Sequence, residues 1–110
     1  MAANYLRKYL TPAASTETTL YTPPDANTAV VSSLRVTNEN ANPANLTVAV
    51  YPGGGGTPYY LLRSYVLPTN QTMDVFSGVS CVLEAGDVLK VTASQSSVDF
   101  YLSYMQLDRT

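Results

Sequence analysis

The chain has 110 residues and a mass of 11.8 kDa, which is the size of one ordinary domain. Only 13% of its residues are charged, against about 25% in a typical globular protein, and its net charge is −2. This balance argues against direct binding of nucleic acid, because backbone phosphates are bound by clusters of Lys and Arg. No apolar run reaches the ~18 residues of a membrane-spanning helix, so we expect no membrane partner.

Almost every segment alternates apolar and polar residues with a period of two, and none has the 3.6-residue period of a helix. Val, Thr, Tyr and Leu dominate these segments, and Pro and Gly separate them at short intervals. The sequence therefore predicts an all-β protein, an antiparallel β-sandwich of jelly-roll type with about eight or nine short strands. The expected strands are approximately Asn4–Leu10, Thr16–Thr22, Ala29–Asn38, Leu46–Tyr51, Tyr59–Leu67, Thr72–Phe76, Val79–Leu83, Val88–Ala93 and Val98–Leu107.

The alternation also predicts which side chains share a face of each strand. Three strands give the clearest sets: Val30, Leu34 and Val36; Leu46, Val48 and Val50; and Val98, Phe100, Leu102 and Tyr104. An antiparallel sheet that covers a core on one side typically has one apolar face and one polar face.

A glycine run, Pro52 to Pro58, lies between two of the expected strands. It lacks the Lys and Ser/Thr at fixed offsets, and the following helix, that a phosphate-binding loop requires. Four consecutive glycines in this place instead predict the flexible tip of a hairpin.

Residues that carry chemistry are scarce in this chain. Histidine is absent, which removes the commonest general base and zinc ligand. Cys81 is the sole cysteine; Val82 and Leu83 follow it, so it is predicted to be a small buried hydrophobe rather than a reactive thiol. Glu84 and Asp87 flank a Gly-containing turn and are expected to be turn residues. We therefore expect no enzymatic activity, no metal site and no cofactor.

The N-terminus combines Tyr, Arg and Lys where a signal peptide needs a continuous apolar core, so we expect a cytoplasmically made protein. Residues 1–19 are interpreted as an N-terminal arm with the first strand, and residues 20–110 as the sandwich domain. Residues 1–10 are a candidate for an arm that reaches a neighbouring molecule.

The nine tyrosines are the most informative feature of the composition. Two expected strands, Tyr59–Leu67 and Val98–Leu107, are apolar on both faces, although a sandwich of this size has one interior. The alternatives are that a tucked N-terminal segment covers the second face or that another subunit does. We favour a subunit interface, because tyrosine offers a large amphipathic area at low entropic cost. The candidate interface residues are Tyr5, Tyr9, Tyr59, Tyr65, Tyr101 and Met105.

From about Leu20 to Leu107 the chain resembles small β-sandwich proteins of tailed bacteriophage virions, namely capsid decoration (cement) proteins and related domains of tail proteins. The resemblance rests on LYTPPDANTAVVSSLRVTN, LTVAVYPGG, LPTNQTMDV, LEAGDVLKVTAS and VDFYLSYMQL. It implies a virion component, made in the host cytoplasm, that self-associates as a homotrimer and docks on the major capsid protein or the tail. The free-standing domain favours a decoration protein that staples neighbouring capsid subunits and stabilises the phage head.

Two alternatives remain. The first is a tail, neck or fibre component of the same particle. The second is a carbohydrate- or receptor-binding module that stacks sugars on Tyr51, Tyr59 and Tyr60, which is disfavoured because the chain has no Trp and these aromatics are not clustered with carboxylates.

Overall fold

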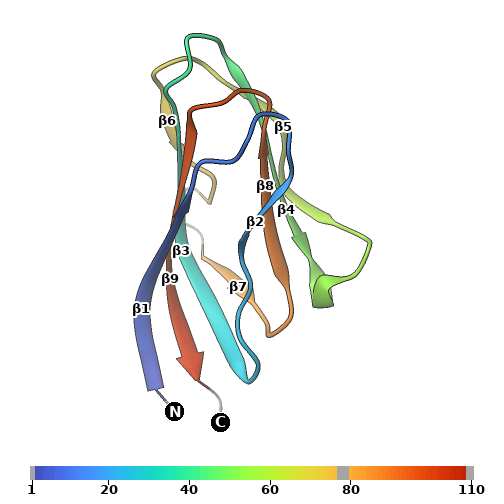
Figure 1. Cartoon of the computed structure of the whole chain (residues 1–110). Helices are drawn as coiled ribbons and strands as arrows, with labels where there is room; N and C mark the ends of the chain where they lie inside the picture. Colours follow the sequence, from blue (N-terminus) through green and yellow to red (C-terminus); the bar gives the residue numbers. More distant parts are fainter. Residues whose placement is uncertain (1, 77–79, 109–110) are drawn as a thin grey trace.

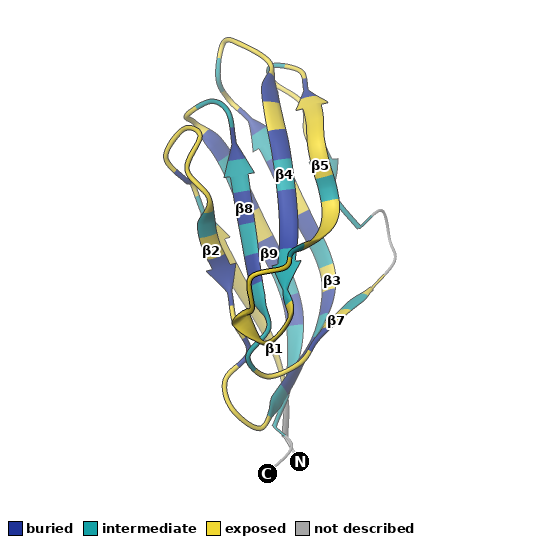
Figure 2. Ribbon diagram, turned by 90° about the vertical axis from the view of Figure 1, so that its right-hand side faces the viewer, coloured by how far each residue is buried: buried dark blue, intermediate teal, exposed yellow. Residues whose placement is uncertain are grey.

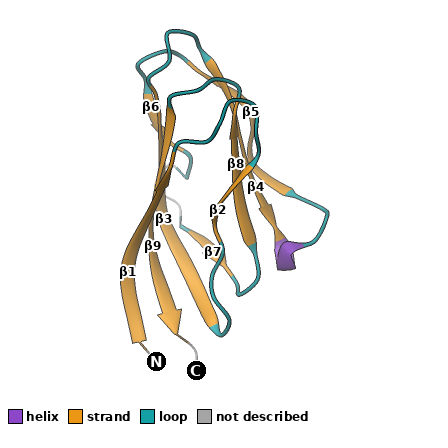
Figure 3. Cartoon of the chain, in the orientation of Figure 1, coloured by secondary structure: helices purple, strands orange, loops and turns teal. Residues whose placement is uncertain are grey.

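The structure of the protein is a computed structural model, and it describes residues 2–76 and 80–108. Within these residues nine strands form two antiparallel sheets that pack face to face (Figures 1 and 3). The strands are β1 (Ala2–Leu10), β2 (Thr18–Tyr21), β3 (Asn27–Asn38), β4 (Ala44–Tyr51), β5 (Tyr59–Leu67), β6 (Thr72–Asp74), β7 (Cys81–Leu83), β8 (Val88–Ala93) and β9 (Val98–Asp108). The predicted all-β sandwich is confirmed.

The first sheet has the order β1-β9-β3, and both β6 and β7 pair with the far side of β3. The second sheet has the order β2-β8-β4-β5. Strands from the start of the chain thus lie beside strands from its end, β1 beside β9 and β2 beside β8, which is the connectivity of a jelly roll. The edges of the first sheet are β1 on one side and β6 and β7 on the other, and those of the second sheet are β2 and β5. β1 and β5 lie on opposite sides of the sandwich (Figure 1).

The core is built from the alternating strands that the sequence marks most clearly. Val98, Phe100, Leu102 and Tyr104 of β9 all point inward and are buried, as predicted. Leu89 and Val91 of β8 face them from the second sheet, and the alternation of buried and partly exposed residues along β8 and β4 is visible in Figure 2. The largest fully buried side chain is Phe100.

One predicted face is wrong in its first residue. Leu34 and Val36 are buried as expected, but Val31 is fully buried in place of Val30, which is partly exposed. The pairing of β3 with β9 shifts register between Val31 and Ser33. This β-bulge inserts one residue and so moves the side chains before it to the opposite face.

The glycine run forms the β4–β5 hairpin tip, as predicted, and begins with a short 3₁₀ turn at Pro52–Gly54. Gly53 and Gly54 have φ of 63° and 74°, in the left-handed region that glycine adopts without a steric penalty. The backbone N–H of Gly53 donates to the Asp87 carboxylate at 2.9 Å. The tip is therefore fastened to the β7–β8 turn.

The N-terminal strand belongs to the sandwich. β1 pairs with β9 of its own chain over all nine residues, from Ala2 opposite Asp108 to Leu10 opposite Phe100. The expected division between residues 19 and 20 falls inside β2, which pairs with β8. The described residues before the division thus form the edge strand of the first sheet, the connection to the second sheet and the first two residues of β2.

Candidate interaction surface

The outer face of the first sheet carries two rows of large side chains across its strands. Directly opposite residues in an antiparallel sheet share a face. One row runs Tyr9, Tyr101 and Arg35 across β1, β9 and β3. The second runs Tyr5, Met105, Val30 and Val82 across β1, β9, β3 and β7. We call these residues, apart from Arg35, the tyrosine face: Tyr5, Tyr9, Val30, Val82, Tyr101 and Met105.

The three tyrosine rings of the tyrosine face expose a large aromatic area to solvent. Tyr5 is 86% exposed, Tyr9 69% and Tyr101 40%. With ~200 Å² for a tyrosine side chain, these three rings leave roughly 390 Å² in solvent. A specific protein interface buries about 800 Å² per partner, so three side chains supply about half of that area. Exposed aromatic area of this size is typical of an interaction site.

Two of the rings are held in place within the chain. The rings of Tyr9 and Tyr101 stack with their centroids 6.3 Å apart and their planes 11° apart. The Arg7 guanidinium lies 5.8 Å from the centre of the Tyr9 ring, and its hydrogen bond with Tyr101 raises the pKa of Arg7 above its usual value. Pre-positioned aromatic groups lose little conformational entropy when a partner binds.

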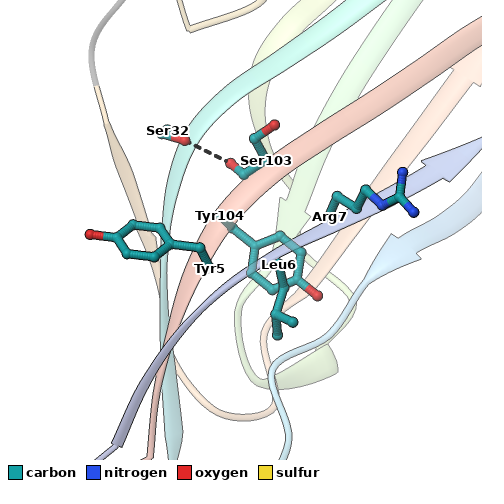
Figure 4. A pocket seen from close by; sticks show the side chains of 6 residues that line it. All are labelled: Tyr5, Leu6, Arg7, Ser32, Ser103 and Tyr104. Carbon is teal, nitrogen blue, oxygen red and sulfur yellow. Dashed lines mark hydrogen bonds between the residues drawn. The ribbon is translucent and has the colours of Figure 1, made fainter.

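A shallow hollow of about 540 Å³ opens beside the middle of β1. It is lined by Tyr5, Leu6 and Arg7 of β1, by Ser32, and by Ser103 and Tyr104 of β9. Figure 4 shows Tyr5 and Arg7 on either side of Leu6, and the Ser32 hydroxyl donating to the carbonyl oxygen of Ser103 at 3.0 Å. The lining of the hollow thus combines aromatic, aliphatic, hydroxyl and guanidinium groups.

The structure brings together four of the six candidate interface residues: Tyr5, Tyr9, Tyr101 and Met105. Tyr59 and Tyr65 are on β5, the edge of the second sheet, where most of the strand is exposed (Figure 2). Among the described residues, β5 adds a separate exposed apolar set, namely Tyr59, Tyr60, Leu61, Tyr65 and Val66. The two predicted groups therefore lie on different layers of the sandwich.

On the outer face of the second sheet, two tyrosine rings lie beside cationic side chains. The Lys90 amino group lies 4.6 Å from the centre of the Tyr51 ring, and the Arg63 guanidinium lies 4.7 Å from that of Tyr60. The Tyr51 hydroxyl donates to the Glu17 carboxylate at 2.9 Å, and this bond raises the pKa of Tyr51. The expectation that these tyrosines lie away from carboxylates is therefore wrong for Tyr51. The fold brings Glu17, which directly precedes β2, within hydrogen-bonding distance of Tyr51 on β4.

The outer face of the second sheet is partly covered by its own side chains. Ala49 lies opposite both Lys90 and Tyr60, on the outer side of β4, yet it is fully buried. Cations stand over the two rings, and the Tyr51 hydroxyl has its partner within the chain. Part of the aromatic surface on this sheet is thus already in contact with groups of the same chain.

Within residues 2–76 and 80–108, no cluster of three or more His, Cys, Asp or Glu side chains could hold a metal ion. Burial raises the pKa of the half-buried Cys81 thiol, which packs against the core. The pKa of Glu39 is raised by a hydrogen bond with Asp99, so these two carboxyl groups lie close together at one end of the first sheet. No helix in the described part of the chain is long and apolar enough to cross a membrane.

Comparison with known proteins identifies the fold without a family. No protein-family model matches the chain, and no curated protein matches it. A solved structure of Bacillus endospore appendages, described as a novel family of disulfide-linked pili, is 15% identical with a TM-score of 0.63. That match covers 99% of this chain and 88% of the appendage chain, so the two share the sandwich over nearly their whole lengths.

Two structures of a pentameric capsid protein isolated from metagenomic phage sequences are also similar. They are 20% and 19% identical, with TM-scores of 0.46 and 0.43. Each match covers 96% of this chain, which spans 61% and 62% of the two capsid chains.

Proposed function

We propose that the protein is a non-catalytic structural component of a bacteriophage virion, a decoration protein that self-associates and binds the outside of the head. The observation that carries this proposal is the tyrosine face. It offers pre-positioned aromatic area on the exposed face of a sheet, and its residues include no group of side chains that would act on a small substrate. A protein partner with a flat surface fits such a face better than a small ligand, which would need a deeper pocket.

The low charge of the chain supports the same role. A decoration protein buries much of its surface against other subunits, and uncharged polar side chains are easier to remove from water than ions. Many copies, each making a modest contact, would stabilise the head through multivalency. The sequence resemblance to phage decoration and tail proteins supports a place in the virion, and the shared sandwich fold of the endospore appendage shows that this architecture can serve in an assembly.

The test uses binding to expanded, undecorated heads of the parent phage, measured by co-sedimentation. Tyr9→Ala removes a central ring of the tyrosine face, and a hot-spot residue of this kind weakens binding by ~30-fold or more. Tyr59→Ala is the matched control, because Tyr59 is 64% exposed against 69% for Tyr9 but lies on the other sheet. We expect the control to bind within about twofold of the unchanged protein. Loss of binding in the control alone, or no binding by the unchanged protein, would refute the proposal.

A tail, neck or fibre component is the second candidate, because the same face could join a ring of subunits. The number of copies in the assembled particle separates the two. Hundreds of copies on the head in an electron-microscopy map support decoration, whereas a few copies at the tail support the alternative. The particle also tests the homotrimer that the sequence resemblance implies.

A further inference from the structure

The free edges of the two sheets differ in length and regularity. Within the described residues, β2 has four residues and a register shift, and β6 and β7 have three residues each. β5 has nine residues, but its pairing with β4 is interrupted twice, and Ser64 has a φ of 51°. β1 also has nine residues, and it pairs with β9 residue for residue without a shift.

β1 is thus the long and regular free edge in the described part of the chain. Such an edge presents a row of unpaired N–H and C=O groups, which is a template for another strand. A strand that pairs along its whole length must itself be regular and free. β1 of a second copy meets both conditions, whereas the bulged β5 does not.

We propose that β1 pairs antiparallel with β1 of a second copy, about a two-fold axis at Leu6. Leu6 is the midpoint of Ala2–Leu10, so this register pairs all nine residues of the strand. The proposal deepens the proposed function, since it rests on self-association and names the contact responsible. The first sheet of each copy becomes half of a continuous sheet through the dimer.

The side chains of β1 favour this register. It places Arg7 opposite the partner's Tyr5 and Lys8 opposite the partner's Asn4, so no like charges meet. Moving the axis to Arg7 or to Lys8 would instead set a cation directly opposite its own copy. A guanidinium over a tyrosine ring is favourable, and Arg7 already makes such a contact with Tyr9.

The inner side of β1 gives a further reason. Leu6 is 41% exposed although it points toward the core side, because the second sheet does not reach over the middle of β1. In the dimer Leu6 packs against the partner's Leu6. On the outer face, the hollow lined by Tyr5, Leu6 and Arg7 lies beside the axis.

The first experiment measures the mass of the protein in solution by light scattering over a range of concentrations. We expect an even number of chains. Leu6→Lys sets two ammonium groups opposite each other and removes the leucine pair, so we expect ~10-fold or greater weakening of association. Leu61→Lys is the matched control, since Leu61 is 38% exposed on β5, the edge strand of equal length in the second sheet. Its mass should equal that of the unchanged protein.

The second experiment detects the β1 contact directly, by cross-linking, and does not depend on a variant that weakens association. In a Cys81→Ala background, Leu6→Cys introduces a single thiol at the axis. Directly opposite residues have Cβ atoms about 4.5–5.5 Å apart, close to the separation that a disulfide spans. Mild oxidation should therefore cross-link Leu6→Cys into dimers and leave Leu61→Cys, in the same background, uncross-linked.

Three outcomes would overturn the β1 pairing: a strict trimer, an assembly that Leu6→Lys leaves intact, or preferential cross-linking of Leu61→Cys. An odd-numbered assembly that still binds heads would leave the proposed function standing while removing this contact. A monomer that also fails to bind heads would refute both.

Discussion

A buried asparagine joins the two sheets at one end of the sandwich. The side-chain amide of Asn38 in β3 donates to the carbonyl oxygens of Leu67 in β5 and of Asn42, each at 3.0 Å. Its side-chain oxygen accepts from the backbone N–H of Asn40 at 2.9 Å. Asn38 is fully buried, so all three bonds lie in a region where their loss is not fully replaced by water.

Replacing Asn38 with Ala removes these three hydrogen bonds. The backbone carbonyl oxygens of Leu67 and Asn42 and the backbone N–H of Asn40 each lose the bond that Asn38 made with them. At ~1 kcal/mol for each bond, the free energy of unfolding should fall by about 3 kcal/mol. An unfolding entropy of ~2.1 cal/mol/K per residue gives about 0.23 kcal/mol/K for a chain of this size, so Tm should drop by ~13 °C. Thermal unfolding followed by circular dichroism and calorimetry measures this change.

The matched control is Asn45→Ala, which alters an exposed asparagine on β4. Its Tm should stay within about 2 °C of that of the unchanged protein, because surface substitutions rarely exceed ~0.5 kcal/mol. A Tm for Asn38→Ala that also lies within about 2 °C would refute the reasoning, since it would mean that water or local rearrangement replaces all three bonds.

Three further changes test other parts of the structure. Burial raises the pKa of Tyr21 in the folded state, so the contribution of this shift to stability is complete below pH ~10 and is lost as the pH rises further. In urea titrations at alkaline pH, Tyr21→Phe should therefore reduce the slope of the unfolding free energy against pH. The pKa of Glu39 is raised by its hydrogen bond with Asp99, so this pair favours the folded state at acid pH and less so as the pH rises through that pKa; Asp99→Asn should lower the Glu39 pKa in an NMR titration. Asp87→Ala removes two backbone hydrogen bonds of the β7–β8 turn and glycine tip, and urea unfolding should show a loss of ~1–2 kcal/mol.

Much of the fold can be predicted from the sequence because the core strands are regular. In β9 the period of two holds from Val98 to Tyr104, and every inward residue is identified correctly. In β3 the same reasoning fails for Val30, because a single bulged residue reverses the faces and leaves no local signal in the sequence. Sequence periodicity therefore predicts a strand more securely than the face of each of its residues.

The candidate surface could be predicted only in part, and for a related reason. The doubly apolar pattern in β9 indicates an exposed aromatic face, and Tyr101 and Met105 are on it. In β5 the same pattern arises from a bulged edge strand whose residues on both faces reach solvent, so Tyr59 and Tyr65 are placed elsewhere. The pairing of β1 with β9, which joins Tyr5 and Tyr9 to the face, links the two ends of the chain, and no local pattern shows such a contact.

The edge position of β1 connects the two proposals physically. A decoration protein must associate through one specific surface without aggregating nonspecifically. Free sheet edges are a common cause of such aggregation, because their unpaired backbone groups can pair with other chains. In β5 the bulge at Ser64 breaks the row of backbone groups, and in β2 the strand is too short to serve as a template. In β1 the backbone is regular, but Arg7 and Lys8, which follow its midpoint, would oppose identical charges in the registers centred on either of them. The two cations thus leave the edge open to one matched partner while discouraging others, which is how a small domain can present a free strand and still assemble specifically.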